Sequence, residues 1–227
     1  MRAALAEAGN AEYAVLFRPY VGIAPAQYGE GDVLLGVRVP ATRAIVKRFR
    51  DLPLDEVDRL LDDPHHECRL AAALLLVAQY KGKPDAVFDR YLAAVYRGRV
   101  NNWDIVDSSA PQIIGSRLVD RDRSLLFELA ASTSLWYRRV AVVSTHQFIR
   151  HGDASTTLAL AERLLGDREL LIHKAVGWML REVGKRVDRS ALVGFLDDHA
   201  AAMPRTMLSY ATEHLEPEQR AHYRALR

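Results

Sequence analysis

Cysteine is almost absent from this sequence, which has a single one, Cys68, in 227 residues. One thiol cannot form an intramolecular disulfide, so we expect a protein of the reducing cytoplasm. The chain also lacks any apolar run near the ~18 residues that a membrane-spanning helix needs. Glu7 interrupts the N-terminal segment where a secretory signal would be apolar. We therefore expect a soluble protein with no membrane partner.

Strand patterns and flexible linkers are also missing. No stretch rich in glycine or serine divides the chain, and no series of alternating apolar and polar residues indicates a sheet. Nearly every segment instead repeats its apolar residues at the helical period, with proline or glycine between segments. The sequence predicts one all-α domain over residues 1–227. Examples of the expected helices are 41–50, 54–61, 67–80, 85–96, 125–131, 135–150, 155–165, 169–186 and 205–215.

A repeat runs through these expected helices. Similar five-residue segments begin at positions 68, 103, 138 and 173, so they recur every 35 residues. A period of this length with two helices per unit is typical of a helical solenoid, in which neighbouring repeats bury each other's apolar faces. Degenerate helical patterns also produce equal spacings by chance, and that alternative stays open from the spacing alone.

Basic residues occupy the equivalent position in three of these four segments and in two similar flanking segments, 42–46 and 204–208. They are Arg43, Arg69, Arg139, Lys174 and Arg205. Equivalent positions stack along one edge of a solenoid, and a row of cations on a concave face suits a phosphate backbone. The net charge is only +2, but a balanced total does not exclude a local basic face. The alternative, of equal weight, is that each cation begins a helix and pairs with an acidic neighbour.

The segment 101–111 carries acidic residues where the other repeats are basic. Asp104 stands at the basic position, and Asp107 follows one helical turn after Trp103. On a helix, Trp103 and Asp107 share one face. An indole can stack on a sugar or base, and a carboxylate can stabilise positive charge. The alternative is an ordinary amphipathic helix start, with Trp103 packed in the core and Asp107 capping or paired.

The segment 65–68 is a second candidate site. His65 and His66 precede Glu67 and Cys68, and histidine and cysteine are common zinc ligands. Adjacent histidines do not readily converge on one ion, and no partner cluster follows. We therefore expect these residues to begin a helix, with Cys68 buried, and we expect no metal site.

The chain resembles the bacterial DNA alkylation repair proteins built from HEAT-like repeats, the AlkD-like alkylpurine DNA glycosylases. Two blocks carry the resemblance most specifically: Trp-Asp-Ile-Val-Asp-Ser at 103–108 and Lys-Ala-Val-Gly-Trp-Met-Leu-Arg-Glu at 174–182. The blocks 35–40 and 135–141 support it, and the resemblance extends over about residues 28–205. It implies an all-α, HEAT-like helical-repeat solenoid with a concave basic face.

The resemblance also implies roles for individual residues. Asp107 matches the family's catalytic carboxylate, and Arg139 matches the arginine that holds the phosphodiester. Trp103 and Trp178 match the two indoles that pack on the backbone of the lesion nucleotide. Arg181, in the second block, joins the basic residues above among the expected DNA contacts. The implied substrates are N3- and N7-alkylpurines in duplex DNA, whose bases carry a positive charge.

These side chains suit the hydrolysis of a glycosidic bond. A cationic purine is already a good leaving group, and positive charge develops on the deoxyribose as the bond stretches. A carboxylate stabilises that charge and orients the attacking water, while indole faces attract the cation. No lysine stands beside the Trp–Asp face, so we do not expect a Schiff-base lyase. We expect a monomeric, monofunctional glycosylase that uses no cofactor. The resemblance implies that its cleft traps the backbone and leaves the base largely outside, unlike enzymes that flip the base into a pocket.

One segment departs from the family pattern. In the glycosylases the chain before the 35–40 block forms a helix that supplies a tyrosine near the lesion. Here Tyr28 is followed by Gly29 and Gly31, which disfavour a continuous helix. This segment and the pair 101–102 resemble a sibling subfamily. Further upstream, we expect Tyr13, Phe17 and Tyr20 to pack within a capping helix.

Two other functions stay open. A non-catalytic member of the same family would use the basic face to bind a DNA structure, and the altered N-terminal segment favours that reading. A repeat scaffold that binds protein would be favoured by an acidic face in place of the basic one.

Overall fold

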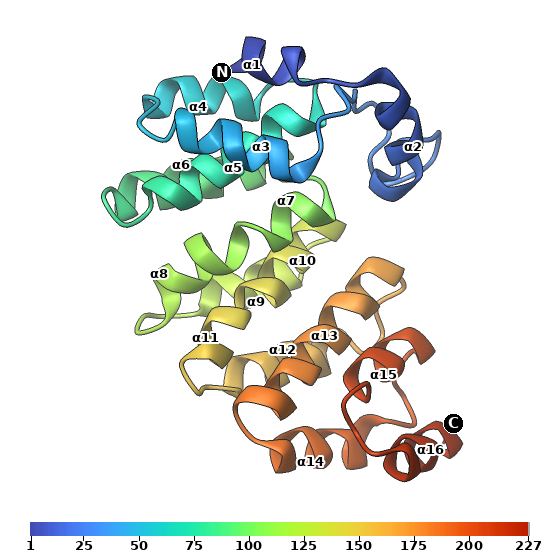
Figure 1. The fold of residues 1–227 in the computed structure, drawn as a ribbon. Coiled ribbons are helices and arrows are strands. Elements are labelled where there is room, and N and C mark those ends of the chain that lie inside the picture. The colour runs from blue at the N-terminus through green and yellow to red at the C-terminus, as the bar shows by residue number, and fades with distance from the viewer. Residues whose placement is uncertain (227) are drawn as a thin grey trace. The chain divides into compact units, whose positions relative to one another are not determined.

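The computed structural model describes residues 1–226, and its regular structure is helical (Figure 1). Within these residues no strand forms, and the one β-type contact is an isolated parallel bridge between Val33 and His65. The predicted all-α class is confirmed. None of the described helices is long and apolar enough to cross a membrane. The chain divides into two compact units, Met1–Ile113 and Ile114–Arg227, and each is described by itself. The assignment of 1–227 to a single domain stays a prediction.

The first unit is built around one buried helix. Its helices are α1 (Arg2–Glu7), α2 (Ala11–Val21), α3 (Val39–Arg48), α4 (Leu54–Leu61), α5 (His66–Gln79), α6 (Pro84–Tyr96) and α7 (Trp103–Asp107). α5 contacts α1, α3, α4, α6 and α7. Every residue of α5 from His66 to Leu76 is buried, as expected of a helix covered on all sides. The polar residues at its start are therefore buried too, and each needs a partner.

The second unit shows the predicted repeat. A π-helical turn, Pro111–Gly115, leads into α8 (Ser116–Leu118), α9 (Ser124–Ala130), α10 (Leu135–Ser144), α11 (His146–Arg150), α12 (Ser155–Arg163), α13 (Leu170–Arg186), α14 (Arg189–His199), α15 (Arg205–Ala211) and α16 (Pro217–Ala225). The helices α10, α13 and α15 begin at Leu135, Leu170 and Arg205, which are 35 residues apart, and α13 contacts both of the others. α9 packs on α10, and α12 packs on α13. Within this unit the helix pairs predicted from the period are confirmed.

Gly177 explains one of the specific sequence blocks. It lies on α13, and a Cβ atom added there would come within 2.5 Å of the carbonyl oxygen of Met207 on α15. Any side chain would push the two helices apart, so glycine permits their close approach. The neighbouring Trp178 is thereby held at the packed face between successive repeats.

The predicted helix 135–150 is interrupted in the structure. α10 ends at Ser144 and α11 begins at His146. The Ser144 hydroxyl donates to the carbonyl of Val140 at 2.7 Å, and the Thr145 hydroxyl donates to the carbonyl of Val142 at 2.7 Å. Hydroxyls that bond to the preceding turn compete with the helical ladder and bend it.

Glu67 anchors the non-helical segment 22–38 to the start of α5. Its buried carboxylate accepts hydrogen bonds from the backbone N–H groups of Leu35 at 2.9 Å, Gly36 at 2.7 Å and Val37 at 3.2 Å. Gly36 has φ of +77°, and an added Cβ would lie 1.9 Å from the carbonyl oxygen of Asn10. Only glycine fits there. The Leu-Gly-Val block of the sequence is therefore a binding element for one buried carboxylate.

Replacing Glu67 by alanine should destabilise the protein. The change leaves three buried N–H groups without an acceptor, and each such loss costs ~1–3 kcal/mol. We expect the free energy of unfolding, measured by urea denaturation, to fall by at least ~3 kcal/mol. Glu67→Gln keeps the shape and one carbonyl acceptor, so it should lose less. Equal stability of Glu67→Ala and the wild type would contradict this anchoring role.

Candidate functional site

The Trp–Asp segment forms helix α7, which is five residues long and carries Trp103 and Asp107 one turn apart, as predicted. So short a helix is not stable by itself. Ile105 and Val106 are fully buried and fix one side of α7 to the core, where α7 contacts α5. Trp103 and Asp107 are half-buried. The helix therefore presents an indole and a carboxylate that remain partly accessible.

Side chains at the start of α7 bind the last carbonyls of α2. Nδ2 of Asn102 donates to the carbonyl of Val21 at 2.9 Å, and Nε1 of Trp103 donates to the carbonyl of Tyr20 at 2.9 Å. Oδ1 of Asn102 accepts from the backbone N–H of Trp103 at 2.9 Å. The last carbonyls of a helix have no partner within it, so the end of α2 and the start of α7 satisfy each other. The Trp103 ring is fixed by its N–H edge, which also fixes the direction of its faces.

A buried charge network holds the other side of the start of α7. Nε2 of His66 lies 2.8 Å from Oδ2 of Asp104, and Nδ1 of His66 lies 3.8 Å from Oδ2 of Asp32. Asp32 also pairs with the guanidinium of Arg69. Asn101 accepts a hydrogen bond from Nε of Arg69 at 3.2 Å. The negative charge at the predicted basic position is thus paired with a histidine, which explains how Asp104 is tolerated there.

His66 is positively charged at neutral pH in this network. Burial alone would lower its pKa, but the charge of the Asp104 carboxylate, its hydrogen bond to the ring and the nearby Asp32 outweigh burial, and the pKa rises to about 9. Arg69 opposes this shift slightly. The ring of Phe17 on α2 meets the imidazole edge-on, with centroids 6.4 Å apart. The buried imidazolium of His66 thus lies between two carboxylates. This pairing of opposite charges holds the start of α7.

A buried phenol, that of Tyr91, lies near enough to Asp107 to feel its charge. The hydroxyl of Tyr91 is 2.8 Å from Oγ of Ser109, and the Ser109 hydroxyl donates to the carbonyl of Ile105 at 2.6 Å. Burial raises the pKa of Tyr91 above its ordinary value, and the nearby charge of Asp107 adds to the shift. Tyr91 therefore supports the C-terminal turn of α7 as an uncharged group and does not compete with Asp107 as a base.

The other two residues of the implied catalytic set lie in the second unit. Arg139 on α10 is 5% exposed and donates to the carbonyl of Leu171 on α13. Trp178 on α13 is half-buried, and its ring packs against His146 with centroids 5.8 Å apart. Burial lowers the pKa of His146, so this imidazole is neutral at pH 7, although Glu182 lies 4.0 Å from its Nε2. His146 therefore packs against Trp178 as an uncharged ring.

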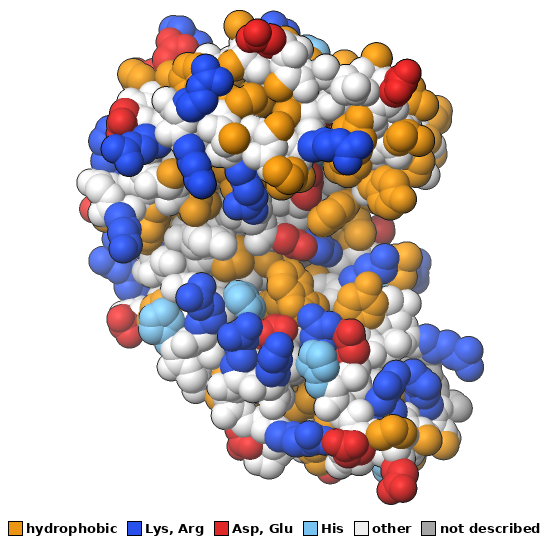
Figure 2. Space-filling model, in the orientation of Figure 1, with side chains coloured by type: hydrophobic (Ala, Val, Ile, Leu, Met, Phe, Trp, Pro, Cys, Tyr) orange, Lys and Arg blue, Asp and Glu red, His pale blue; other side chains and the backbone are white. Residues whose placement is uncertain are grey.

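The expected DNA contacts differ in exposure. Arg43 and Arg205 are exposed, Lys174 and Arg181 are half-buried, and Arg69 and Arg139 are buried. Arg181 pairs with Glu213, so part of its charge is compensated within the protein. Figure 2 shows lysine and arginine side chains over the drawn face of each unit, with acidic side chains among them.

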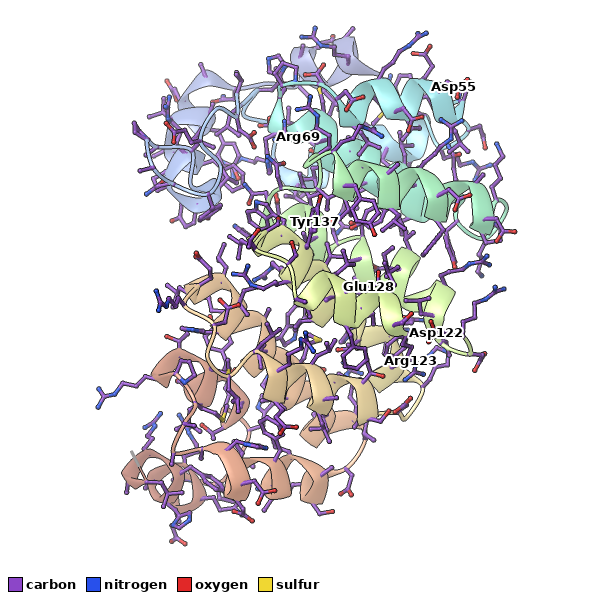
Figure 3. All side chains as sticks on the ribbon, turned by 180° about the vertical axis from the view of Figure 1, so that it is seen from behind. Asp55, Arg69, Asp122, Arg123, Glu128 and Tyr137 are labelled. Carbon is purple, nitrogen blue, oxygen red and sulfur yellow. The ribbon has the colours of Figure 1, made fainter. Side chains whose placement is uncertain are left out.

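The structure corrects the role expected for Arg69. Its side chain lies among the helices of the first unit (Figure 3), and the residue is 1% exposed. Besides Asp32 and Asn101, its guanidinium donates to the carbonyls of Asp63 at 3.0 Å and Pro64 at 3.1 Å. With these donors directed at protein oxygens, Arg69 holds the loop before α5 and is not presented to a phosphate. The repeat period gave its register along the chain but not the direction of its side chain.

A cluster of potential metal ligands occurs at the start of α5. Ligand atoms of Asp63, His65 and Cys68 lie within 4.8 Å of one another. Asp63 already accepts hydrogen bonds from Nε of Arg2 at 2.7 Å and from the backbone N–H of His65 at 2.9 Å. Burial raises the pKa of the Cys68 thiol to about 12, so it is protonated at neutral pH. These contacts account for the cluster, and the prediction that 65–68 begin a helix with Cys68 buried is confirmed.

The N-terminal aromatic residues form the expected helix but are not all packed. Tyr13 and Phe17 of α2 stack with centroids 5.5 Å apart, and Phe17 and Tyr20 stack at 6.2 Å. Tyr20 is nevertheless 67% exposed. As predicted, no helix forms between Tyr28 and Asp32. The Tyr28 hydroxyl donates to the carbonyl of Tyr20 at 2.8 Å, the same oxygen that binds the Trp103 indole.

Comparisons with known proteins agree with this fold. A family model described as DNA alkylation repair enzyme matches residues 1–215. Among solved structures, the fold is similar to that of a predicted DNA alkylation repair enzyme from Enterococcus faecalis. The TM-score is 0.73 at 16% sequence identity, and the match covers 92% of this chain and 97% of the other. No curated protein sequence matches the chain.

Stability should fall as the pH rises from about 6.5 towards about 9. His66 holds its proton up to about pH 9 in the folded state but only to about 6.5 when unfolded, so its contribution is full below 6.5 and is lost as the pH rises through 9. The contribution is on the order of 3 kcal/mol. Urea unfolding at a series of pH values measures this loss of stability. In His66→Asn the loss should be smaller by the part that the one titrating proton of His66 contributes.

An NMR titration of the imidazole provides a direct check that does not depend on a variant. A wild-type His66 that titrates at or below its ordinary pKa of 6.5 would contradict the buried ion pair with Asp104.

Proposed function

This chain belongs to the DNA alkylation repair enzyme family, and from that premise we propose that it is a monofunctional DNA glycosylase for positively charged N3- and N7-alkylpurines in duplex DNA. The observation that carries the proposal is the fixed indole–carboxylate face of α7. Trp103 is oriented by its hydrogen bond to the Tyr20 carbonyl, and Asp107 follows one turn later on the same short helix. A side chain held in place before the substrate arrives needs no reorganisation during the reaction.

In the proposed reaction, Asp107 acts on the sugar and not on the base. The alkylated purine already carries positive charge and leaves without protonation by the protein. As the glycosidic bond breaks, the Asp107 carboxylate stabilises the cationic deoxyribose and accepts a hydrogen bond from the attacking water. The Trp103 face adds attraction to the developing cation. The products are the free alkylpurine and an abasic nucleotide.

Arg139 and Trp178 supply the backbone contacts in this proposal. Arg139 is proposed for this role because its block resembles that of the family, although the residue is only 5% exposed and its guanidinium donates to the carbonyl of Leu171. A guanidinium binds two phosphate oxygens at once, which a lysine does not. Trp178 packs on the same stretch of sugar-phosphate backbone. We infer these two roles from the resemblance of blocks 135–141 and 174–182 to the family.

The remaining partners follow from the same proposal. Arg43, Lys174, Arg181 and Arg205 contact phosphates of the duplex on either side of the lesion. The reaction as written needs no metal or organic cofactor, and a monomer carries every residue named. The cytoplasm, where the single cysteine stays reduced, is the proposed location.

One observation favours a second candidate, a DNA-structure binder without activity. The segment 22–38 contains no helix, so the helix that supplies a tyrosine near the lesion in the glycosylases is not formed there. Tyr28 instead bonds to the end of α2. A binder of this kind would use the same basic residues but release no base.

The Asp107→Asn variant distinguishes the glycosylase from the DNA-structure binder. This variant keeps the shape of the side chain but removes the charge that stabilises the sugar cation. We expect it to release N7-methylguanine and N3-methyladenine from methylated duplex DNA about 100- to 1,000-fold more slowly than the wild type, which corresponds to ~2.7–4 kcal/mol. Duplex affinity should stay the same or rise, because a negative charge near phosphate is gone.

Asp104→Asn is a partly matched control. It removes a carboxylate from the same helix, but this carboxylate is paired with His66. It should reduce stability more than the rate of base release in the folded fraction. No base release by the wild type, with duplex binding retained, would refute the glycosylase and leave the DNA-structure binder.

A further inference from the structure

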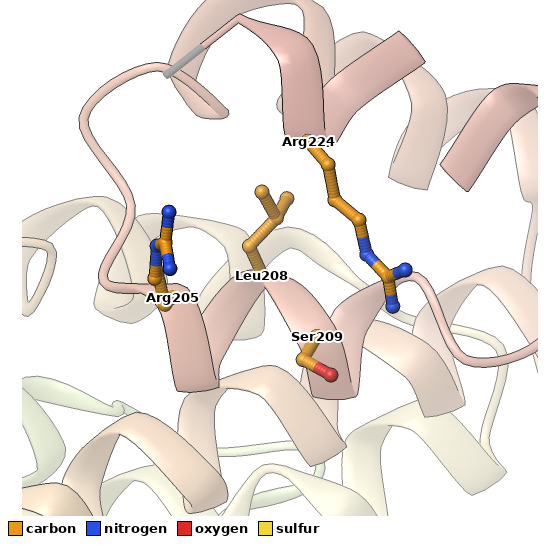
Figure 4. A pocket seen from close by; sticks show the side chains of 4 residues that line it. All are labelled: Arg205, Leu208, Ser209 and Arg224. Atoms are coloured by element: carbon orange, nitrogen blue, oxygen red, sulfur yellow. The ribbon is translucent and has the colours of Figure 1, made fainter. Parts of the chain in front are cut away.

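A cavity in the second unit has no role in the reaction described above. Its volume is about 320 Å³, and it is lined by Arg205, Leu208 and Ser209 of α15 and by Arg224 of α16 (Figure 4). Arg205 and Arg224 flank the space, and Leu208 lies between them. Arg205 is an expected DNA contact, whereas Arg224 and Ser209 were not singled out by the sequence.

Among the described residues, no carboxylate pairs with either of the two arginines that line this cavity. Within residues 1–226, neither Arg205 nor Arg224 forms an ion pair or a side-chain hydrogen bond. Other arginines of the same unit are paired: Arg186 lies 2.6 Å from Glu182, and Arg138 lies 2.6 Å from Asp167. Two uncompensated cations beside one cavity raise its positive potential, which an anion would lower.

The lining of the cavity matches a nucleotide unit of a nucleic-acid backbone. Guanidinium groups and the Ser209 hydroxyl are donors suited to phosphate oxygens. Leu208 is 3% exposed and provides an apolar surface for the adjoining sugar. Both arginines and Ser209 are exposed, so a polymer lying across the surface reaches them without entering the protein.

The helix that carries Arg205, Leu208 and Ser209 packs on a helix of the proposed reaction. α15, which carries Arg205, packs on α13, which carries Trp178. The close approach occurs at Gly177, directly before Trp178. A duplex whose backbone packs on Trp178 therefore has a neighbouring stretch within reach of the next repeat.

We propose that Arg205, Ser209 and Arg224 form a phosphate site that binds one backbone phosphate of the DNA beside the lesion. This site rests on the proposed function for its ligand, since duplex DNA is the substrate proposed above. It extends the expected DNA contacts from α15 to the C-terminal helix α16. Its role is to fix the position of the duplex and not to take part in bond breaking.

Binding of an unmodified short duplex at a series of salt concentrations tests the site. Fluorescence anisotropy gives the dissociation constant, and its dependence on salt counts the phosphates contacted. We expect Arg205→Gln and Arg224→Gln each to lower the slope of log affinity against log salt by about 0.9 and to weaken binding roughly fivefold to tenfold at low salt. Because both residues hold one phosphate, the double variant should lose the slope of one contact and not of two.

Arg163→Gln is the matched control. Arg163 is exposed in the last turn of α12 in the same unit, and it does not line the cavity, so the variant removes the same charge elsewhere. Its salt slope should equal that of the wild type. Thermal unfolding of each variant confirms that it is folded at the temperature of the measurement.

Three results would overturn the site. The first is an unchanged slope in Arg224→Gln, and the second is an equal effect of Arg163→Gln, which would show that only net charge matters. The third is a combination of two observations: millimolar inorganic phosphate stabilises the wild type but not the double variant, and the salt slopes of DNA binding are unchanged in the variants. The cavity would then hold a free anion and not a phosphate of DNA. The duplex carries no lesion, so absence of base release with the expected slopes would refute the glycosylase and leave this site standing.

Discussion

The hydrogen bond between the Trp103 indole and the Tyr20 carbonyl is the contact on which the candidate site depends most. It joins the start of α7 to the end of α2, across 83 residues of sequence. The ion pair of Asp104 with His66 and the hydrogen bond between Asn101 and Arg69 complete the attachment. A helix of five residues has too few internal hydrogen bonds to persist alone, so these contacts create the α7 that presents Asp107.

The N-terminal segment that departs from the family pattern is part of this arrangement. Gly22 has φ of +62° and ends α2, and the ring of Tyr28 packs where its side chain would be. Glu67 binds the far end of the segment, and Asp32 within it pairs with Arg69. The segment has no helix, but it is bonded to the rest of the unit. It contributes a carboxylate and a tyrosine to the surroundings of α7. The loss of one helical element is therefore compatible with a firmly held indole–carboxylate face.

The helical period of the apolar residues predicted helices and the faces that their side chains share. It did not predict contacts that depend on a partner from a distant part of the chain. The apolar repeat located α5, α13 and the face shared by Trp103 and Asp107. It did not reveal that His66 meets Asp104, because these residues are 38 positions apart and neither belongs to an apolar stripe. Arg69 and Arg139 occupy the same register and both are buried, because the 35-residue period fixes a position along the chain and not the exposure of its side chain. α14 and α16 were also missed, because Gly194 interrupts the first and the second is mostly polar.

The central claim is that Trp103 and Asp107, held on α7, act on one nucleotide. A double-mutant cycle of Asp107→Asn and Trp103→Ala on the single-turnover rate of N7-methylguanine release tests it most directly. If both side chains serve the same transition state, the loss in the double variant will be clearly smaller than the product of the two single losses. Independent losses that multiply, or a wild type that releases no base, would contradict the account.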